Sequence, residues 1–346
     1  MKRFLFVFTL LIALTNPNCA QKNKDSLYVG FWNLENLFDT LDDPKVDDNE
    51  FLPNTEKEWT EERLEKKMYN LSRIIRTMND GNGPDILGFC EVENQNVLDR
   101  MVNNFLSDFH YQVVHIESPD ARGIDNALIF DSTRFSLLSK VGLRVDLGSA
   151  GETRFILHTT LLFRERDTIH YYVNHWPSRR GGQTESEWRR IAAANVLHQS
   201  VTEELNKNKN AKIIIVGDFN DEPNNESILN YLMANPLMCD SVNISDLQVD
   251  NDSDLFNLSY QEWANGKGSF MYQQDFNMLD QIIISKNLLV GEEINYKCSS
   301  FQIYTHQLMV TRTGKFKDAP FPTYGGRRYL GGYSDHFPVI ANFVVR

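Results

Sequence analysis

Residues 213 to 220 read Ile-Ile-Ile-Val-Gly-Asp-Phe-Asn, and this stretch decides the fold class of the chain. Four apolar residues in a row suit a strand that is buried on both faces. Gly217 permits a sharp turn, and the side chains of Asp218 and Asn220 can project toward the same side. The stretch therefore predicts a buried strand whose polar end lies at the rim of a sheet.

The same pattern recurs at three other places in the chain. The apolar runs and the polar residues that follow them are residues 27–32 with Asn33, 86–90 with Glu91, and 169–173 with Asn174 and His175. Residues 127–130 and 282–284 look like two further strands. Polar residues at strand ends are expected at the rim of a sheet.

Helical patterns separate these strands. Residues 60–78 carry apolar side chains at helical spacing, and a second pattern covers about 97–106. A third helix is predicted to open with Thr184 and Glu187 as a capping box and to carry Trp188 on its apolar face. This alternation, without an internal repeat or a linker, predicts a single α/β domain.

Residues 1–20 differ from the rest, because a basic start precedes an apolar run at residues 4–14 that is too short to span a bilayer. We interpret them as a signal peptide that is cleaved after Ala20, leaving a domain at residues 21–346 that is exported to the periplasm, the outer surface or the medium. Lipid attachment at Cys19 is the alternative. No later run predicts a transmembrane helix in the mature chain.

Charge and cysteine content limit the function classes. The net charge is −12, so nothing predicts a general attraction to nucleic acid. Two loops, at residues 39–50 and 246–254, are strongly acidic; calcium binding is open for both, but neither has the spacing of a known calcium loop, which favours solvated loops. Export would leave Cys90, Cys239 and Cys298, which allow one internal disulfide at most.

Three polar residues at strand ends suggest phosphate chemistry. A hard divalent cation takes one or two carboxylates as ligands, and Glu91 is well placed to provide one. Asp218 can take a proton from water, and the NH₂ group of Asn220 can hold a phosphate oxygen. The alternative is that Asp218 and Asn220 merely cap a turn.

An acid lies beside a histidine near the C-terminus, at Asp335 and His336, and Asp280 begins another apolar run. A histidine held by a carboxylate stays protonated to higher pH and can bind a phosphate oxygen or orient the attacking water. A single such pair is usually structural, but here it accompanies the polar strand ends.

Taken together, these residues resemble the endonuclease/exonuclease/phosphatase superfamily. The matching motifs, in the family's order, are Phe31-Trp32-Asn33-Leu34-Glu35-Asn36, Gly88-Phe89-Cys90-Glu91-Val92, Asn174-His175-Trp176-Pro177, Gly217-Asp218-Phe219-Asn220, Asp280-Gln281-Ile282-Ile283-Ile284-Ser285 and Ser334-Asp335-His336. The resemblance implies a four-layer α-β-β-α sandwich, with two packed β-sheets and the site at one rim.

The resemblance also implies a role for each matched residue. Glu91, Asn33 and Asp335 correspond to the residues that hold or support Mg²⁺, with Mn²⁺ or Ca²⁺ left open. The implied catalytic residues are His175, Asp218, Asn220, Asp280 and His336. Asn220 and His175 also correspond to substrate contacts.

Arginines and aromatic residues lie close to these motifs. We favour Arg122 and Arg179 as further substrate contacts, because guanidinium groups on glycine-containing loops can fork onto phosphates. Three other arginines could be substrate contacts or solvated surface residues: Arg180, Arg327 and Arg328. Four aromatic residues could stack on bases, although packing is the commoner role: Trp176, Tyr324, Tyr329 and Tyr333.

The function predicted on these grounds is an exported, metal-dependent nuclease that hydrolyses DNA or RNA phosphodiester bonds by attack of activated water. A local basic groove would suffice for a nucleic-acid substrate. The alternatives are a phosphatase or phosphodiesterase for lipid head groups or small phosphorylated molecules, and a non-catalytic binding module of the same fold. Nothing implies a stable protein partner, so a monomer is expected.

Overall fold

The computed structural model describes residues 25–239 and 255–346 of the chain. The predicted signal peptide, Cys19 and the acidic loop at residues 246–254 lie outside the described residues. No helix in the two described ranges is long and apolar enough to cross a membrane.

Two mixed β-sheets of seven strands form the centre of the molecule. The first has the order β14-β18-β1-β2-β4-β3, with β15 also paired to β18: β14 (Ile294–Tyr296), β18 (Val339–Val345), β1 (Ser26–Leu37), β2 (Ile86–Val92), β4 (Asp125–Asp131), β3 (Tyr111–His115) and β15 (Gln302–Ile303). The second has the order β5-β6-β7-β8-β13-β10-β9: β5 (Phe135–Leu143), β6 (Ile156–Phe163), β7 (Asp167–His175), β8 (Lys212–Asp218), β13 (Asp280–Ser285), β10 (Leu255–Asn257) and β9 (Asn235–Pro236). All the predicted strands are present.

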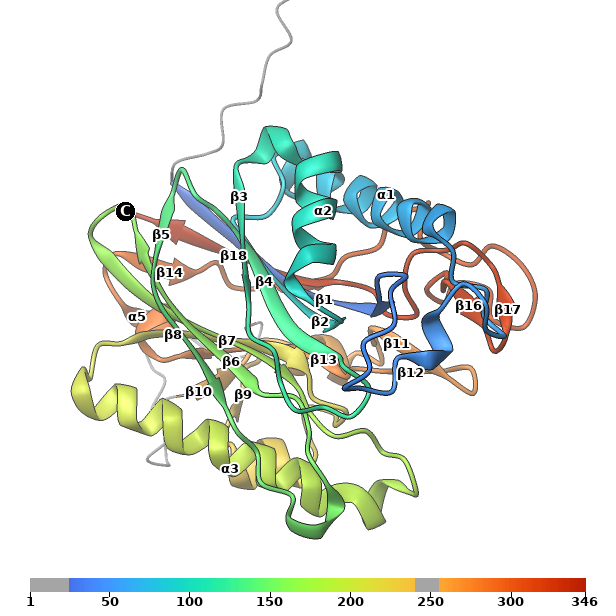
Figure 1. Cartoon of the computed structure of the whole chain (residues 1–346). Helices are drawn as coiled ribbons and strands as arrows, with labels where there is room; N and C mark the ends of the chain where they lie inside the picture. The colour runs from blue at the N-terminus through green and yellow to red at the C-terminus, as the bar shows by residue number, and fades with distance from the viewer. Residues whose placement is uncertain (1–24, 240–254) are drawn as a thin grey trace, which may run out of the picture.

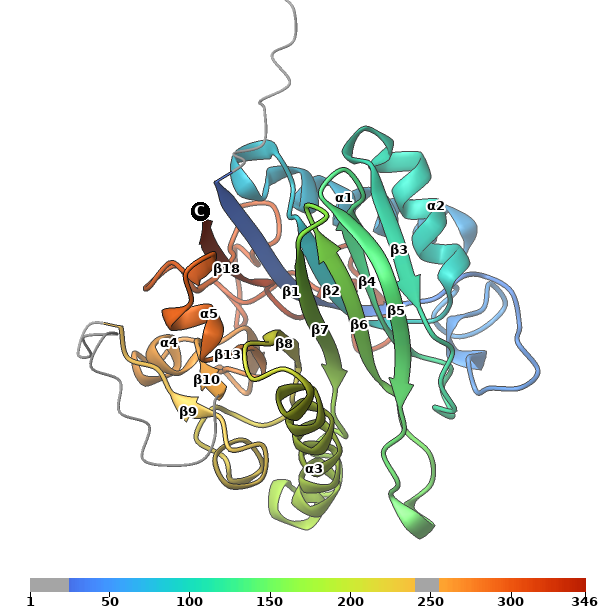
Figure 2. The same ribbon diagram turned by 90° about the vertical axis from the view of Figure 1, so that its left-hand side faces the viewer.

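Helices cover the outer faces of both sheets (Figures 1 and 2). The helices α1 (Glu61–Thr77) and α2 (Gln95–Phe105) lie on the first sheet, and α3 (Gln183–Lys207) lies on the second. Smaller elements complete the described part: the helices α4 (Tyr260–Ala264) and α5 (Asn287–Val290), and the hairpins β11 (Phe270–Tyr272) with β12 (Asp275–Asn277) and β16 (Tyr324–Gly325) with β17 (Arg328–Tyr329). The four-layer sandwich is confirmed.

The strands of the two central layers are buried on both faces. In β8, Ile214 and Val216 pack between the sheets, whereas Ile213 and Ile215 pack under α3. The sheets approach closely at Gly88, where an added Cβ would lie 2.9 Å from Val216 Cγ2. Burying each such apolar side chain contributes about 1.5–3 kcal/mol, so the continuous apolar runs account for the sandwich.

Gly217 has a different role from the expected one. It lies inside β8 and not in a turn, and a Cβ there would collide with the carbonyl oxygen of Asn174 on β7. Glycine is therefore needed for the close approach of β7 and β8, which brings their polar ends together.

The beginning of α1 agrees with the prediction, but that of α3 does not. Thr60 precedes α1, and its hydroxyl accepts the N–H of Arg63. The capping box at Thr184 and Glu187 is wrong, because α3 already begins at Gln183, directly after Gly182. Gly182 has a φ of 121°, a conformation that glycine adopts readily, so the chain can enter the helix without a side-chain cap.

Trp188 was expected on the buried face of α3, and this is also wrong, since the residue is 46% exposed. The buried residues of α3 are instead Ser186, Arg190, Ala193, Ala194, Leu197 and Val201. Elsewhere, Cys239 and Cys298 form a disulfide and Cys90 is free and buried. The acidic loop at residues 39–50 is mostly exposed, as expected, except for the buried Asp48.

Candidate active site

The polar ends of central strands from both sheets meet at one rim. In the second sheet, Asp218 lies opposite His175 of β7 on one side and Asp280 of β13 on the other. Asn33, in the C-terminal half of β1 in the first sheet, donates from Nδ2 to Asp218 Oδ2 at 3.1 Å. This hydrogen bond connects the two sheets at the site.

The loop that carries His336 is fixed against β1 by two hydrogen bonds and is braced by a third within the loop. Ser334 donates from its hydroxyl to the carbonyl oxygen of Asn33 at 2.6 Å and accepts the N–H of His336 at 3.1 Å. Trp32 donates from Nε1 to the carbonyl oxygen of His336 at 2.9 Å. Residues more than 300 positions apart therefore share one rim.

Asn33 orients the two carboxylates nearest to it. Its NH₂ group faces Asp218 and Glu91, the latter at 3.4 Å, while its amide oxygen accepts the N–H of Glu35 at 2.9 Å. In this orientation the NH₂ group of Asn33 holds the two carboxylates, and its amide oxygen is used by one backbone N–H.

Glu91 projects into the site from an irregular end of β2. Its φ is 59°, a left-handed conformation that is unfavourable for glutamate, and the pairing of β2 with β4 shifts register after Phe89. One carboxylate oxygen accepts the N–H of Asn36 at 2.9 Å, and the other lies 3.9 Å from His175 Nε2. The irregular backbone thus directs this carboxylate toward the rim.

Asp218 is held in a defined orientation, and the pKa of its carboxyl is raised. Its Oδ1 accepts the N–H of Asn220 at 2.9 Å, so the expected turn cap is present in addition to any chemical role. Burial raises the pKa of Asp218 to about 6, although the nearby His336 opposes the shift. The NH₂ group of Asn220 donates to the carbonyl oxygen of Trp176 at 2.9 Å and retains a second N–H.

His336 is a buried cation. Its Nδ1 lies 2.7 Å from Asp280 Oδ2, an oxygen that also accepts the hydroxyl of Ser269. Burial disfavours the charged imidazole, but the carboxylates of Asp280, Asp335 and Asp218 prevail and raise the pKa of His336 well above its ordinary value. Its Nε2 lies 3.9 Å from Asp218 Oδ2.

The pKa of His175 is shifted in the opposite direction from that of His336. Burial, followed by the positive charges of Arg154, Arg122 and His336, lowers the pKa of His175 well below its ordinary value. The carboxylates of Glu91 and Asp218, each 3.9 Å from Nε2, do not reverse this effect. His175 is therefore neutral at pH 7 and can donate one N–H, but it is a poor general acid.

A cavity of about 360 Å³ opens beside these groups. Its lining includes six of the predicted catalytic and metal-binding residues: Glu91, His175, Asp218, Asn220, Asp335 and His336. It also includes four arginines: Arg122, Arg154, Arg180 and Arg189. The structure therefore combines carboxylates, histidines and arginines in one concave site, in a chain of net charge −12.

Arg179 does not line this cavity, in contrast to Arg122. Its guanidinium donates to the carbonyl oxygen of Asn220 at 2.6 Å and to Oδ1 of Asn225 at 3.1 Å, and it lies 3.5 Å from Asp221. Arg179 thus braces the loop that follows β8. Arg327 and Arg328 also lie outside the cavity lining.

Sequence reasoning missed two buried cations near the site. Arg154, directly before β6, pairs with Asp120 at 3.1 Å and donates to the carbonyl oxygen of Trp176 at 2.8 Å. Lys67 of α1 lies 3.7 Å from Glu35 and donates to its carbonyl oxygen at 3.3 Å. The helical spacing did contain a signal for Lys67, because position 67 falls on the apolar stripe of α1.

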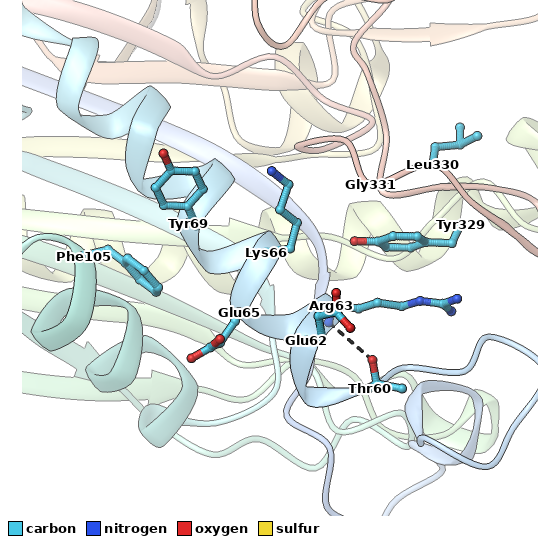
Figure 3. Close-up of a pocket in the computed structure, with 10 residues that line it drawn as sticks. All are labelled: Thr60, Glu62, Arg63, Glu65, Lys66, Tyr69, Phe105, Tyr329, Leu330 and Gly331. Atoms are coloured by element: carbon cyan, nitrogen blue, oxygen red, sulfur yellow. Dashed lines mark hydrogen bonds between the residues drawn. The ribbon is translucent and has the colours of Figure 1, made fainter.

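Most of the aromatic residues near the motifs pack inside the protein and do not line the cavity of the site. Trp176, Tyr324 and Tyr333 are buried. Tyr329 lies over the guanidinium of Arg63, at 4.4 Å, in a separate cavity of about 950 Å³ beside α1 (Figure 3). That larger cavity contains none of the predicted catalytic residues, so its size does not make it the active site.

Oxygen donors suited to a divalent cation line the cavity, and Asp218 belongs to two groups of potential ligand atoms that lie within 4.8 Å of one another, Cys90–His175–Asp218 and Asp218–Asp280–His336. Carboxylate oxygens of Glu91, Asp218 and Asp335 are hard ligands of the kind that Mg²⁺, Mn²⁺ and Ca²⁺ prefer. Burial raises the pKa of Asp335 to about 7, and the negative charges of Glu35 and Glu91 add to this shift. This excess of negative charge is what a bound cation would neutralise.

The fold and the site define a hydrolase that acts on phosphate ester bonds. The chain belongs to the Endonuclease/Exonuclease/phosphatase family, whose model matches residues 28–344. Members of this family depend on divalent metal ions. No curated protein sequence matches this chain.

Several solved structures share the fold. D. rerio TDP2 complexed with a single-strand DNA product is 12% identical and covers 92% of this chain and 98% of its own, with a TM-score of 0.56. The human Nocturnin catalytic domain with bound sulfate is 19% identical over 94% and 97%, with a TM-score of 0.53. The Bacteroides thetaiotaomicron mannosyl-6-phosphatase is 16% identical over 92% and 99%, with a TM-score of 0.55.

Proposed function

We propose that this protein is a metal-dependent phosphodiesterase that hydrolyses nucleic-acid strands. The observation that carries the proposal is the position of Asp218 between the neutral His175 and the charged His336, in the wall of a cavity that arginines also line. This arrangement offers a base for water and cationic groups for phosphoryl oxygens on adjacent sides of one space.

In the proposed mechanism, Asp218 accepts the proton of the attacking water, because Asn33 and Asn220 already fix the orientation of its carboxylate. His336 keeps its proton through Asp280 and donates from Nε2 to a phosphoryl oxygen. Attack in line with the ester bond forms the new P–O bond as the old one breaks, and the departing alkoxide takes a proton from solvent. Proton transfer by a positioned side chain contributes about 10²- to 10⁴-fold.

The metal role is assigned to Glu91, with Asp335 assisting through water. When bound, a divalent cation would neutralise the charge that builds on the phosphoryl oxygens. We propose Mg²⁺ as the ion, and Mn²⁺ and Ca²⁺ are the alternatives that the same oxygen donors would accept.

Three features support a phosphodiester strand as the substrate. Arg122 lines the cavity and is half exposed, so its guanidinium is available to a strand that enters from solvent. Phe270 also lines the cavity and stacks on the His336 ring at a centroid distance of 4.6 Å, which places an apolar surface beside the scissile position. One protein of the same fold, D. rerio TDP2, is described in complex with single-strand DNA product.

A phosphatase or phosphodiesterase for lipid head groups or small phosphorylated molecules is the second candidate. The cavity is only about 360 Å³ and the chain is acidic, which favour a short substrate over a long strand. A mannosyl-6-phosphatase shares the fold. The aromatic residues that would have stacked on bases, Trp176, Tyr324 and Tyr333, are buried, which also reduces the support for a strand.

A substrate panel separates the two candidates. The purified chain without residues 1–20 would be assayed with Mg²⁺ on plasmid DNA, single-stranded RNA, bis-p-nitrophenyl phosphate, a hexose phosphate and sphingomyelin, beside His336→Ala. Cleavage of DNA or RNA that is lost in the variant supports the nuclease. Cleavage of the hexose phosphate or sphingomyelin alone assigns the second candidate, and no cleavage by a folded protein contradicts both.

We also propose that the protein is exported. The disulfide between Cys239 and Cys298 supports this, because such bonds persist in oxidising compartments and are rare in the cytosol. The intact mass of the protein from its native host shows whether residues 1–20 are removed and whether Cys19 carries a lipid. A chain that begins at Gln21 supports cleavage after Ala20, a lipid-modified Cys19 supports the anchored alternative, and a full-length cytosolic chain contradicts export.

A further inference from the structure

A further group of potential metal ligands lies outside the active-site cavity. It consists of His115 at the end of β3, Asp125 at the start of β4 and Glu117 in the loop between these strands. One ligand atom from each of the three side chains lies within 4.8 Å of the other two. None of the three residues lines the cavity of Asp218 and His336. We propose that His115, Glu117 and Asp125 form a separate binding site for Zn²⁺.

The histidine and the aspartate are already close to the separation that a zinc ion requires. His115 Nε2 lies 3.0 Å from Asp125 Oδ2, and both side chains are buried. With bonds of about 2.0–2.1 Å, two ligands of a tetrahedral zinc ion lie roughly 3.3 Å apart. A small widening of this contact would therefore admit the ion between the two side chains.

The carboxylate of Asp125 is held in the orientation that the site needs. Its other oxygen, Oδ1, accepts the N–H of Ser118 at 2.9 Å, which directs Oδ2 toward His115. Hydrogen bonds from groups behind the ligands orient carboxylates in this way in metal sites. Glu117 is exposed, so its carboxylate can move onto the ion from the solvent side. One water molecule would complete a four-coordinate shell.

The local charge and the kind of donor both favour a transition-metal ion. Partial burial raises the pKa of Glu117, and the negative charges of Asp125 and Asp43 add to the shift, while His115 and Lys45 oppose it. An ion pair of His115 and Asp125 alone does not require this third carboxylate. Imidazole is a ligand that zinc accepts readily, whereas Mg²⁺ and Ca²⁺ prefer oxygen donors only.

The position of the three ligands indicates what the ion would hold in place. They flank the loop at residues 116–124, in which Asp120 pairs with Arg154 at 3.1 Å and Arg122 lines the catalytic cavity. A bound ion would close the base of this loop and limit the movement of Arg122. The zinc site goes beyond the proposed hydrolysis and does not depend on it, because its ion would be structural.

Calorimetric titration with Zn²⁺ tests the site without any measurement of activity. The chain without residues 1–20 would be treated with a chelator, dialysed and titrated beside Glu117→Gln. The matched control is Glu165→Gln, because Glu165 is exposed in the turn between β6 and β7, at the other end of the second sheet from the active site. We expect one zinc-binding event to weaken at least tenfold in Glu117→Gln and to stay unchanged in Glu165→Gln. Equal affinities in all three proteins overturn the proposal.

Two further measurements separate this site from the active site. Glu91→Gln should leave the same binding event unchanged, and an event that weakens there as much as in Glu117→Gln overturns a separate site. Anomalous diffraction at the zinc absorption edge should show a peak about 2.0–2.2 Å from His115 Nε2 and from carboxylate oxygens of Glu117 and Asp125. A peak at the active site only, or no peak in crystals soaked with Zn²⁺, overturns the proposal and leaves His115 and Asp125 as an ion pair.

Discussion

His336 Nδ1 and Asp280 Oδ2 lie 2.7 Å apart, and both side chains are buried at the meeting point of the two sheets. Asp280 begins β13 in the second sheet, whereas the loop of His336 is fixed against β1 in the first. The pair therefore joins the two halves of the sandwich and maintains a positive charge within reach of Asp218.

Replacing Asp280 by asparagine tests the origin of that charge. Asp280→Asn removes the carboxylate that does most to raise the pKa of His336, so the histidine would lose its proton at a lower pH. We expect the alkaline limb of the profile of kcat/KM against pH to move to lower pH, with activity falling at least tenfold at pH 8. An alkaline limb identical to that of the wild type would show that Asp280 does not maintain the proton.

The acid limb of the profile of kcat/KM against pH should reflect the protonation of Asp218. Burial raises the pKa of this carboxyl to about 6, and only its deprotonated form can accept a proton from water. Activity should therefore be present above about pH 6 and fall as the pH decreases through that value, tenfold per unit below it. A bound divalent cation favours the carboxylate, so higher metal concentration should move this limb to lower pH.

Asp218→Asn is the companion variant. We expect it to reduce kcat at least 10²-fold at every pH, because its amide cannot act as a base. Rates of the wild type, measured from pH 4.5 to pH 8 at two metal concentrations, give the pH at the midpoint of the acid limb. A wild-type rate that stays constant from pH 8 to pH 4.5 would refute the assignment of Asp218 as the base.

Behind the site, Lys67 and Glu35 form a buried ion pair that should matter for stability. Glu35 also accepts the N–H groups of Thr323 at 2.6 Å and Tyr324 at 3.1 Å, so it holds the loop before the second hairpin. Lys67→Met leaves this carboxylate without its cation, which should lower the free energy of unfolding by about 3–5 kcal/mol. Urea unfolding at pH 7 measures the loss.

Two further variants test whether the loss of stability comes from the buried ion pair. Adding Glu35→Gln to Lys67→Met removes the uncompensated charge and should recover part of the loss. Lys66→Met is the control, since Lys66 is exposed on the same helix, and it should change stability by less than about 0.5 kcal/mol. Equal effects of Lys66→Met and Lys67→Met would contradict the buried pair.

The sequence predicted the fold well because a strand that is buried on both faces leaves an unambiguous apolar run, as at residues 213–216. It also located Glu91, His175 and Asp218, because each ends such a run. Arg154 was missed because it lies before a strand and belongs to none of the matched motifs.

Other features depend on tertiary contacts that local patterns do not encode. Arg179 and Arg180 are adjacent in sequence, yet Arg180 lines the cavity while Arg179 braces the loop of Asn220. The start of α3 followed the conformation of Gly182 and not the nearby capping residues. Lys67 could have been recognised, because a lysine on the apolar stripe of a helix requires a buried partner.

Metal-dependent hydrolysis at Glu91 is the central claim, and one titration tests it most directly. Hydrolysis of bis-p-nitrophenyl phosphate would be followed after treatment with a chelator and during addition of Mg²⁺, for the wild type and for Glu91→Gln. We predict that the chelator abolishes activity, that Mg²⁺ restores it in the wild type, and that the variant stays at least 10²-fold slower at saturating Mg²⁺. Full activity in the chelator, or a variant that regains the wild-type rate, would contradict the account.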